Sequence, residues 1–277
     1  MMVYLINLKE SLDLEVLEPV GGGSINDAYR GRRQDGVFLF VKTHPAPPDG
    51  FFKAEAAGLN ALADAGATVP RVITQASDHL VLEWIDTAPP GRNSMVQLGE
   101  ALARVHGTVG PHFGYSELTY CGLSPQSNQA STDGHAFFAE HRLLRLGAWA
   151  FDAGHLTRPH MRQLERLCDR LPELIPVQPP SLIHGDLWSG NVLFDAGYQP
   201  VLIDPAVSWS WAEADLAMTR LFGGFDERFH EVYQAHRPLE PGFEQRVPIY
   251  NLYHLLNHLN LFGGGYRSSV LSVLKGF

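Results

Sequence analysis

The stretch LIHGDLWSGN, residues 182–191, places the imidazole of His184, the carboxylate of Asp186 and the amide of Asn191 on one short segment between apolar runs. Asp and Asn side chains commonly accept hydrogen bonds from nearby backbone amides, so one interpretation is an ordinary polar turn. The other interpretation is a catalytic loop. A second acid favours the loop, because Asp204 ends the next apolar run thirteen residues after Asn191. We therefore expect the fold to bring two acids and an amide together.

The spacing of these residues is that of a phosphoryl-transfer site. Asn191 follows Asp186 by five residues, as in the catalytic-loop pattern H-R-D-L-x-x-x-N, with Gly185 in place of the arginine. Asp204 takes the place of the D-F-G aspartate, followed by Pro-Ala instead of Phe-Gly. Phosphoryl transfer needs one carboxylate to orient and deprotonate the attacking hydroxyl, and oxygen ligands that hold Mg²⁺. The pattern predicts Asp186 as the catalytic base and Asn191 and Asp204 as magnesium ligands.

Two charged side chains in the first third of the chain support this interpretation. Lys42 ends the apolar strand VFLFVK, and Glu55 lies on the apolar stripe of a helix predicted over 51–65. Burying either charge alone is costly, whereas a pair offsets much of the cost. In protein kinases a strand lysine contacts the ATP phosphates and a helix glutamate orients it. We expect Lys42 and Glu55 to form such a pair, the alternative being two surface side chains whose stems lie along apolar surface.

Two further segments are candidates for nucleotide contacts. GGGSIN begins with Gly21, Gly22 and Gly23, whose backbone amides could approach phosphates, although glycines equally form ordinary hairpin turns. No G-x-x-x-x-G-K-[ST] motif is present in the sequence. In LVLEWID, we expect the backbone groups of Glu83 and Ile85 to bond the adenine base.

The predicted elements are strands first and helices afterwards, which is typical of an α+β protein. Strands are predicted at 14–20, 21–30, 37–42 and 79–86, and helices at 51–65, 94–107, 135–150, 161–174 and 250–262. Two more short strands, 181–184 and 200–204, flank the opening motif. Pro89-Pro90-Gly91 breaks the pattern and predicts a hinge. We expect a small β-rich N-lobe over 1–88, which binds nucleotide, and a larger helical C-lobe over 89–277 with the catalytic loop and acceptor site.

Composition limits the class of protein. The chain has 277 residues, of which 45% are hydrophobic, and a net charge of −9, which argues against a nucleic-acid partner. The two cysteines, Cys121 and Cys168, form no C-x-x-C pair, so a reducing compartment fits better than a disulfide framework. We expect a cytoplasmic protein, because the first residues lack a signal-peptide pattern and no apolar run is long enough to cross a membrane.

Together these residues resemble the fructosamine kinase (ketosamine 3-kinase) family, within the aminoglycoside-phosphotransferase-like, protein-kinase-like superfamily. The resemblance extends over nearly the whole chain and includes GGGSINDAYR, FFKAEAAGL, LGEALARVH, HGDLWSGN, EADLAMTRLFGGF and LYHLLNHLNLFGGGY. Many small-molecule kinases share HGD, whereas HGDLWSGN together with LLNHLNLFG is narrower. The resemblance implies an ATP- and Mg²⁺-dependent kinase acting on the sugar 3-hydroxyl of fructosamine and ribulosamine adducts, free or on protein lysines. The unstable 3-phosphate then frees the amine, so the implied role is deglycation.

The resemblance implies the roles already predicted for five residues: Lys42, Glu55, Asp186, Asn191 and Asp204. It adds two supporting residues, because Asp215 in EADLA resembles a buried aspartate that braces the catalytic loop, and His184 resembles a second brace. Ser210-Trp211-Ala212 departs from the glycine and charged residues that relatives commonly have there, which could alter the preferred sugar or amine.

Several other side chains have competing interpretations. Trp188, Trp209 and Trp211 could form a platform for a sugar or an alkyl-amine stem, although aromatic residues more often belong to the core. His254 and His258, four apart on a predicted helix, could bind a metal, but no third ligand lies nearby in the sequence and the flanking leucines favour packing.

Two other functions remain open from the sequence. One is a kinase for another small alcohol, such as an aminoglycoside, choline or homoserine. The other is a nucleotide-binding or scaffold protein without catalysis, which predicts that at least one catalytic group is missing; none is missing here.

Overall fold

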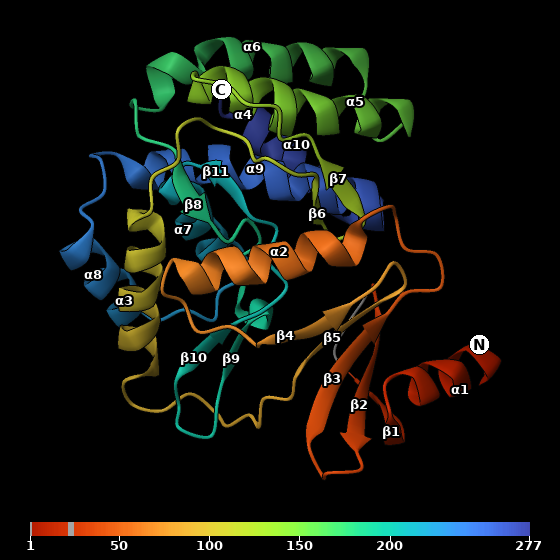
Figure 1. Cartoon of the computed structure of the whole chain (residues 1–277). Coiled ribbons are helices and arrows are strands. Elements are labelled where there is room, and N and C mark those ends of the chain that lie inside the picture. The colour runs from red at the N-terminus through yellow and green to blue at the C-terminus, as the bar shows by residue number, and fades with distance from the viewer. Residues whose placement is uncertain (1, 22–24) are drawn as a thin grey trace.

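The computed structural model describes residues 2–21 and 25–277, with side chains from residue 5 onward, and it combines an N-terminal sheet with a larger helical region (Figure 1). This confirms the expected α+β arrangement. The predicted boundary between residues 88 and 89 stays a prediction. At that point the chain is fastened to the helical region, because the backbone N–H of Ala88 donates to the carbonyl oxygen of Phe194 at 2.9 Å.

Five antiparallel strands form the N-terminal sheet, in the order β1-β2-β3-β5-β4. They are β1 (Leu14–Val20), β2 (Asp27–Arg33), β3 (Phe38–Thr43), β4 (Val72–Gln75) and β5 (His79–Glu83). A tight turn joins β2 to β3: Asp35 accepts a hydrogen bond from the backbone N–H of Val37 at 3.1 Å, and Gly36 has φ 83°, a conformation that favours glycine. The sequence does not predict β4, because four residues are too few for an alternating pattern.

Helix α1 (Met2–Ser11) precedes the sheet and packs beside β1. Its buried Leu8 and the partly buried Leu5 lie against Leu14 and Leu39 of the sheet. The sequence pattern does not predict this helix. Its apolar residues form no clear stripe on one face, and the helix is positioned by its packing against the sheet.

Helix α2 (Phe51–Asp64) lies between the sheet and the helical region (Figure 1). Phe52 and Leu59 are fully buried and pack with Leu80 of β5. On the other side, Gly58 lies so close to Pro205 that an added Cβ would be 3.1 Å from that ring. The missing side chain at Gly58 therefore lets α2 approach the segment that carries Asp204.

The helical region contains eight α-helices in the described chain: α3 (Ser94–Gly107), α4 (Gly134–Phe138), α5 (Arg145–Asp152), α6 (Arg158–Leu174), α7 (Ala212–Leu221), α8 (Glu227–His236), α9 (Phe243–Phe262) and α10 (Arg267–Lys275). A π-helical segment, Ala139–Leu144, joins α4 to α5, and a 3₁₀ turn, Gly264–Tyr266, precedes α10. Buried leucines of α6 and α9 form the centre of the core, including Leu164, Leu252 and Leu256. Helices α3 and α8 touch closely at Gly99, where a Cβ would lie 2.7 Å from the carbonyl oxygen of Phe229.

Three two-stranded sheets carry the loops of the helical region. They pair β6 (Thr119–Cys121) with β7 (Ser124–Gln126), β8 (Ser181–Ile183) with β11 (Ser208–Ser210), and β9 (Val192–Phe194) with β10 (Pro200–Leu202). The quoted loop, 184–191, connects β8 to β9 and ends in a 3₁₀ turn, Ser189–Asn191. Asp204 follows β10, and Leu202 at the end of β10 pairs with Val192 at the start of β9, so this hairpin brings Asp204 beside Asn191.

One local prediction needs correction, because the strand predicted over 79–86 ends at Glu83, where the chain leaves the sheet. Helix α3 begins at Ser94, as predicted, and its N-cap is Asn93. The Ser94 hydroxyl donates to the carbonyl oxygen of Tyr198 at 2.7 Å, because the β9–β10 turn lies against the start of the helix.

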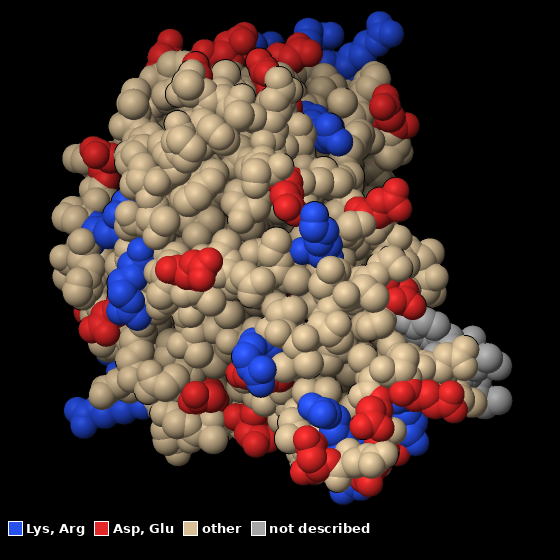
Figure 2. All heavy atoms as spheres, viewed as in Figure 1, with Lys and Arg blue, Asp and Glu red and all other residues tan. Residues whose placement is uncertain are grey.

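Charged side chains of both signs lie on the surface of the described part of the chain (Figure 2), whose sequence has a net charge of −9. On the face shown in Figure 2, acidic and basic side chains of the described residues are interspersed. None of the helices in the described part of the chain combines the length and apolar character needed to cross a bilayer.

Candidate active site

A buried carboxylate fixes the start of the catalytic loop. Asp215 of α7 accepts hydrogen bonds from the backbone N–H groups of His184, at 2.6 Å, and Gly185, at 2.8 Å. Gly185 has φ 82°, and a Cβ there would collide with the carbonyl oxygen of Ala206. Only glycine fits this position without strain, which is a physical reason for its presence where the protein-kinase pattern has arginine.

The same aspartate is held by His106, which Tyr233 holds in turn, and the sequence pattern indicates neither residue. His106, at the end of α3, lies 3.1 Å from Asp215 through Nε2 and 2.7 Å from the hydroxyl of Tyr233 through Nδ1. Burial alone would raise the pKa of Asp215, but hydrogen bonds from His106 and from the loop backbone lower it. The only sequence signal for this chain of contacts is a histidine on the apolar face of α3, beside Leu102 and Val105.

His184 connects the loop to the strand that precedes Asp204. Its Nε2 donates to the carbonyl oxygen of Ile203 at 2.9 Å, and its backbone oxygen accepts from the N–H of Ala206 at 2.8 Å. Burial lowers the pKa of His184, which favours the neutral ring. These two contacts hold the loop against residues 203–206, while the bracing role of His184 stays a prediction.

Asp186 lies at the tip of the loop with a side chain that is 20% exposed. Its Oδ2 accepts from Nδ2 of Asn191 at 3.3 Å, and its backbone oxygen accepts from the same amide at 2.8 Å. Burial and then the charge of Asp204 raise the pKa of Asp186 to about 7, although the bond from Asn191 opposes this. A carboxylate with this pKa can accept a proton near neutral pH.

Asn191 and Asp204 offer a donor set that fits a hard cation. Asn191 donates from Nδ2 to Asp186, which leaves its Oδ1 without a hydrogen-bond donor in the described part of the chain. The N–H of Ile203 donates to the Asn191 carbonyl oxygen at 3.1 Å and keeps the two segments together. The side chain of Asp204 is 46% exposed. A carboxamide oxygen and an open carboxylate are ligands that Mg²⁺ accepts alongside water and phosphate oxygens.

Lys42 of β3 joins the sheet to the segment that carries Asp204. Its Nζ lies 2.7 Å from Oε1 of Glu55 on α2 and 2.8 Å from Oδ1 of Asp204. Burial disfavours the charged amine, but Asp204 and Glu55 outweigh burial and raise the pKa of Lys42. The expected pairing of Lys42 with Glu55 is present, and the contact with Asp204 brings the predicted phosphate and metal residues together.

Comparison with known proteins assigns the chain to a family. The model of the fructosamine kinase family matches residues 5–277. A protein named "probable ketoamine kinase" from Enterococcus faecium is 40% identical over 267 residues, which cover 94% of each chain. The chain belongs to the fructosamine kinase family. As a member, it is a kinase, that is, a phosphotransferase with an alcohol group as acceptor.

Other matches agree with the family and the fold. A chloroplastic protein-ribulosamine 3-kinase of Arabidopsis thaliana is 34% identical over 269 residues, covering 93% of this chain and 81% of that protein. A "putative fructosamine-3-kinase" of Thermobifida fusca superimposes with a TM-score of 0.89 at 36% identity, covering 95% of this chain and 93% of that one. The aminoglycoside phosphotransferase APH(2")-IIa, in complex with gentamicin, gives a TM-score of 0.65 at 14% identity and covers 98% and 94%. These neighbours confirm the protein-kinase-like fold.

The remaining nucleotide predictions for this fructosamine kinase family member are not tested by the structure. Gly21 is exposed, while Gly22 and Gly23 lie outside the described residues. The backbone N–H of Glu83 donates to the carbonyl oxygen of Arg71 at 2.9 Å, so only its carbonyl group could bond a base. The contacts of Glu83 and Ile85 with adenine stay predictions.

The three tryptophans occupy different environments. Trp188 follows Asp186 in the loop and is 39% exposed, with its ring in edge contact with Phe222. Trp209 of β11 is partly buried against Gly110. The prediction that Trp211 contacts the acceptor is wrong: its side chain is 1% exposed and packs in the core with Phe138 and other rings. A fully buried ring cannot stack on a substrate.

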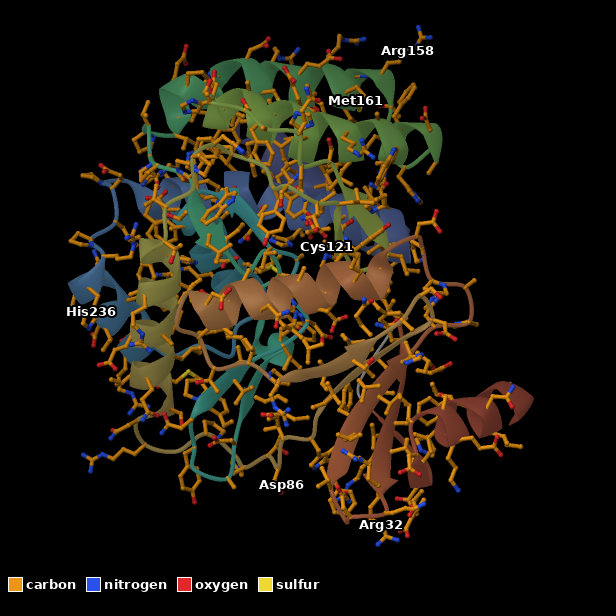
Figure 3. All side chains as sticks on the ribbon, viewed as in Figure 1. Arg32, Asp86, Cys121, Arg158, Met161 and His236 are labelled. Carbon is orange, nitrogen blue, oxygen red and sulfur yellow. The ribbon has the colours of Figure 1, made fainter. Side chains whose placement is uncertain are left out.

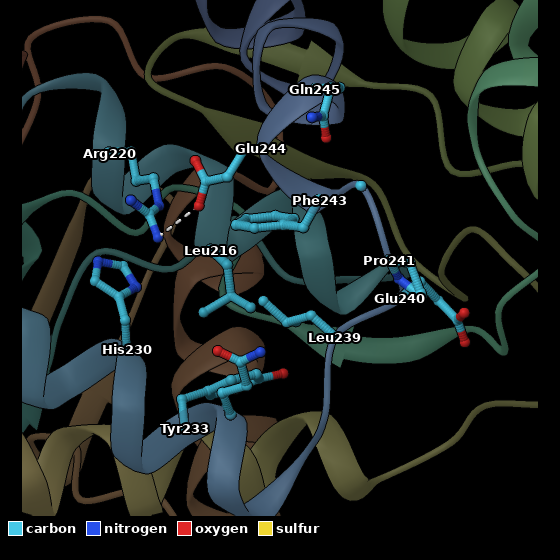
Figure 4. Close-up of a pocket in the computed structure, with 12 residues that line it drawn as sticks. Leu216, Arg220, His230, Tyr233, Leu239, Glu240, Pro241, Phe243, Glu244 and Gln245 are labelled. Carbon is cyan, nitrogen blue, oxygen red and sulfur yellow. Dashed lines mark ion pairs between the residues drawn. The ribbon is translucent and has the colours of Figure 1, made fainter.

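A separate hollow of about 380 Å³ lies among α7, α8 and the start of α9 (Figure 4). Arg220 and Glu244 form an ion pair of 2.9 Å across one side of it, next to His230. Burial lowers the pKa of His230 to about 4. None of the predicted catalytic or nucleotide residues lines this hollow, so it is not the site of phosphoryl transfer.

Proposed function

We propose that this chain is an ATP- and Mg²⁺-dependent kinase that phosphorylates the sugar 3-hydroxyl of ketosamines. The observation that carries the proposal is the convergence of Lys42, Asp186, Asn191 and Asp204 in a member of the fructosamine kinase family. Relatives named ketoamine kinase and protein-ribulosamine 3-kinase support the ketosamine class and the 3-position. The consequence would be deglycation, because the 3-phosphate breaks down and frees the amine.

In this proposal Asp186 is the catalytic base. Its carboxylate orients the sugar hydroxyl and accepts the hydroxyl proton as the oxygen attacks the terminal phosphorus of ATP. Asn191 holds Asp186 in place through its side-chain amide. The raised pKa of Asp186, about 7, makes it a stronger base than an ordinary aspartate while leaving it largely ionised above neutrality.

Lys42 binds the phosphates of ATP, and Glu55 orients its side chain. The lysine also keeps Asp204 close to the reaction centre. Asn191 Oδ1 and the carboxylate of Asp204 would hold Mg²⁺, which when bound neutralises charge on the phosphate oxygens. We assign the adenine contacts to the backbone of Glu83 and Ile85, and phosphate contacts to the glycines 21–23.

Trp188 is the proposed aromatic contact for the acceptor. It lies two residues from Asp186, and the residue is 39% exposed. An aromatic face of this kind can pack against a sugar ring or the alkyl stem of a glycated amine. Trp209, which is partly buried, is a secondary candidate, and Trp211 is excluded. The acceptor is a free ketosamine or a glycated lysine on a protein.

A substrate panel tests this proposal. The purified chain is incubated with Mg²⁺-ATP and fructoselysine, ribuloselysine, a glycated protein, an aminoglycoside, choline or homoserine, and ADP formation is measured. The proposal expects turnover of at least one ketosamine well above all other acceptors. Turnover confined to an aminoglycoside, choline or homoserine would replace it with the kinase of another alcohol. Absence of turnover on every acceptor would favour a non-catalytic nucleotide-binding protein.

A further inference from the structure

Three side chains that can bind a soft metal meet on the side of Asp186 that faces away from Asn191. They are Cys121 at the end of β6, Asp186, and His254 of α9. Cys121 Sγ, one carboxylate oxygen of Asp186 and one ring nitrogen of His254 all lie within 4.8 Å of one another. Figure 3 shows Cys121 in the interior of the molecule, close to α2. The three residues are far apart in the sequence, so the residues next to His254 and His258 give no sign of the other ligands.

We propose that Cys121, Asp186 and His254 form a binding site for a thiophilic divalent cation such as Zn²⁺, and that the bound ion inhibits the kinase by occupying Asp186. The inhibition rests on the proposed function, whereas the binding does not. The metal of this site is distinct from the Mg²⁺ assigned to Asn191 and Asp204.

A buried ring nitrogen of His254 lacks a hydrogen-bond partner in the described structure. His254 is 3% exposed, and its Nδ1 has no hydrogen-bond partner in the described structure. That atom points towards Asp186, with 3.8 Å between Nδ1 and Oδ1. A buried polar atom without a partner is costly and rare in native proteins. A bound cation would satisfy it.

The two oxygens of Asp186 face different neighbours. Oδ2 accepts from the amide of Asn191, while Oδ1 faces His254. The carboxylate can therefore keep its bond to Asn191 and still offer an oxygen to a metal on the other side. An ion there would neutralise the negative charge that the base needs, and Asp186 would no longer accept the proton of the acceptor hydroxyl.

The spacing suits zinc with a small adjustment. Ligand atoms about 2.0–2.3 Å from a tetrahedral zinc lie roughly 3.3–3.7 Å from one another. The distance of 3.8 Å between His254 and Asp186 is close to this range, and Cys121 needs a shift on the order of 1 Å. Three protein ligands leave the fourth position to water.

The donor types select against Mg²⁺. Thiolate and imidazole groups suit Zn²⁺ and similar ions, whereas Mg²⁺ requires hard oxygen ligands. Binding converts the Cys121 thiol to a thiolate and releases its proton to solvent, together with any proton that Asp186 still carries, and no electron is transferred. Burial raises the pKa of this thiol, but direct coordination deprotonates it.

Spectroscopy with Co²⁺, a coloured substitute for Zn²⁺, tests the site without any assay of activity. Metal-free protein is titrated with Co²⁺, and the near-ultraviolet thiolate-to-cobalt charge-transfer band is followed. The proposal expects one equivalent of Co²⁺ to give the band in the wild type, and Cys121→Ser to abolish it. The chain has one other cysteine, so Cys168→Ser is the matched control and should leave the band unchanged.

The other two ligands are tested by affinity. His254→Gln and Asp186→Asn should each weaken Co²⁺ binding at least about tenfold, because losing even the hydrogen-bond partner of a metal ligand costs about 10–100-fold in affinity. Circular dichroism checks that each variant is folded. If Cys121→Ser is not folded, Cys121→Ala is used in its place. Absence of the band in the wild type, or its survival in a folded Cys121 variant, would overturn the proposal.

Inhibition is measured separately. If the wild type phosphorylates a ketosamine, Zn²⁺ added at constant Mg²⁺-ATP should inhibit it, and Cys121→Ser should retain basal turnover while requiring at least about tenfold more Zn²⁺. Equal inhibition of both proteins, or a cobalt band without inhibition, would refute the inhibitory role. If the wild type phosphorylates no acceptor, the proposed function fails, and the cobalt titrations still decide whether the metal site exists.

Discussion

Replacing Lys42 by Met should destabilise the protein far more than loss of an ordinary surface charge. The ammonium of Lys42 is shared by Glu55, whose side chain is 10% exposed, and Asp204, which is 46% exposed. Asp204 can be hydrated after the substitution, so most of the cost falls on Glu55. Removing one partner of a buried ion pair costs about 3–5 kcal/mol, and we expect this loss in the free energy of unfolding near pH 8.

The loss should depend on pH in a defined direction. Burial already raises the pKa of Glu55, and removing Lys42, which lowers it, raises that pKa further. The folded variant then holds a proton that the unfolded chain has released, so its stability falls as pH rises. Between about pH 8 and pH 5 the deficit should shrink by at least about 1.4 kcal/mol, the free energy of one pKa unit.

Urea unfolding of the wild type and the variant at both pH values measures this directly. Lys53→Met is the matched control, because Lys53 is on the same helix as Glu55 but is 64% exposed and forms only a surface ion pair with Glu117. It should cost no more than about 1 kcal/mol at either pH. The double variant Lys42→Met/Glu55→Leu should recover part of the loss. The reasoning is refuted if Lys42→Met costs no more than Lys53→Met, or if its deficit is the same at both pH values.

Further predictions concern the loop and the tryptophans. Because the pKa of Asp186 is raised to about 7, kcat/KM for the ketosamine should fall as pH drops below about 7. Saturating Mg²⁺ should move this fall in kcat/KM to lower pH. A kcat/KM that is constant from pH 5 to pH 8 would contradict the assignment of Asp186 as the base. Gly185→Ala should lower the free energy of unfolding by at least about 1–3 kcal/mol, since it strains a positive φ and meets Ala206, and thermal unfolding checks this. Trp211→Ala should cost about 3–5 kcal/mol of stability. Trp188→Ala should leave stability within about 1 kcal/mol but lower kcat/KM; the reverse pattern would show that the two rings have been assigned wrongly.

Those parts of the site in which a charged residue lies within an apolar segment could be predicted from the sequence. Lys42 at the end of an apolar strand and Glu55 on an apolar helical stripe each need a partner, and the structure pairs them. The spacing of Asp186, Asn191 and Asp204 is equally informative, because the β9–β10 hairpin brings Asp204 beside Asn191, and Asp186 is only five residues before Asn191. For these residues, the pattern in the sequence already indicates which side chains must meet in the folded protein.

What the sequence does not predict depends on partners distant along the chain. Nothing near His106 indicates that it bonds both Asp215 and Tyr233, since these contacts arise only when α3, α7 and α8 are packed. The meeting of Cys121 with His254 likewise requires β6 to lie beside α9. Trp211 is misassigned because it is close in sequence to Trp209, although the core encloses one ring and leaves the other partly open.

The most direct test of the central claim compares the wild type with Asp186→Asn in one assay. Both proteins are mixed with Mg²⁺-ATP and ribuloselysine or fructoselysine, and ADP and the phosphorylated sugar are quantified together. We predict equal amounts of the two products from the wild type and a rate about 10²–10⁴-fold lower from the variant, because the positioned base is lost. Turnover at the wild-type rate by Asp186→Asn, or no turnover of any ketosamine by the wild type, would contradict the account.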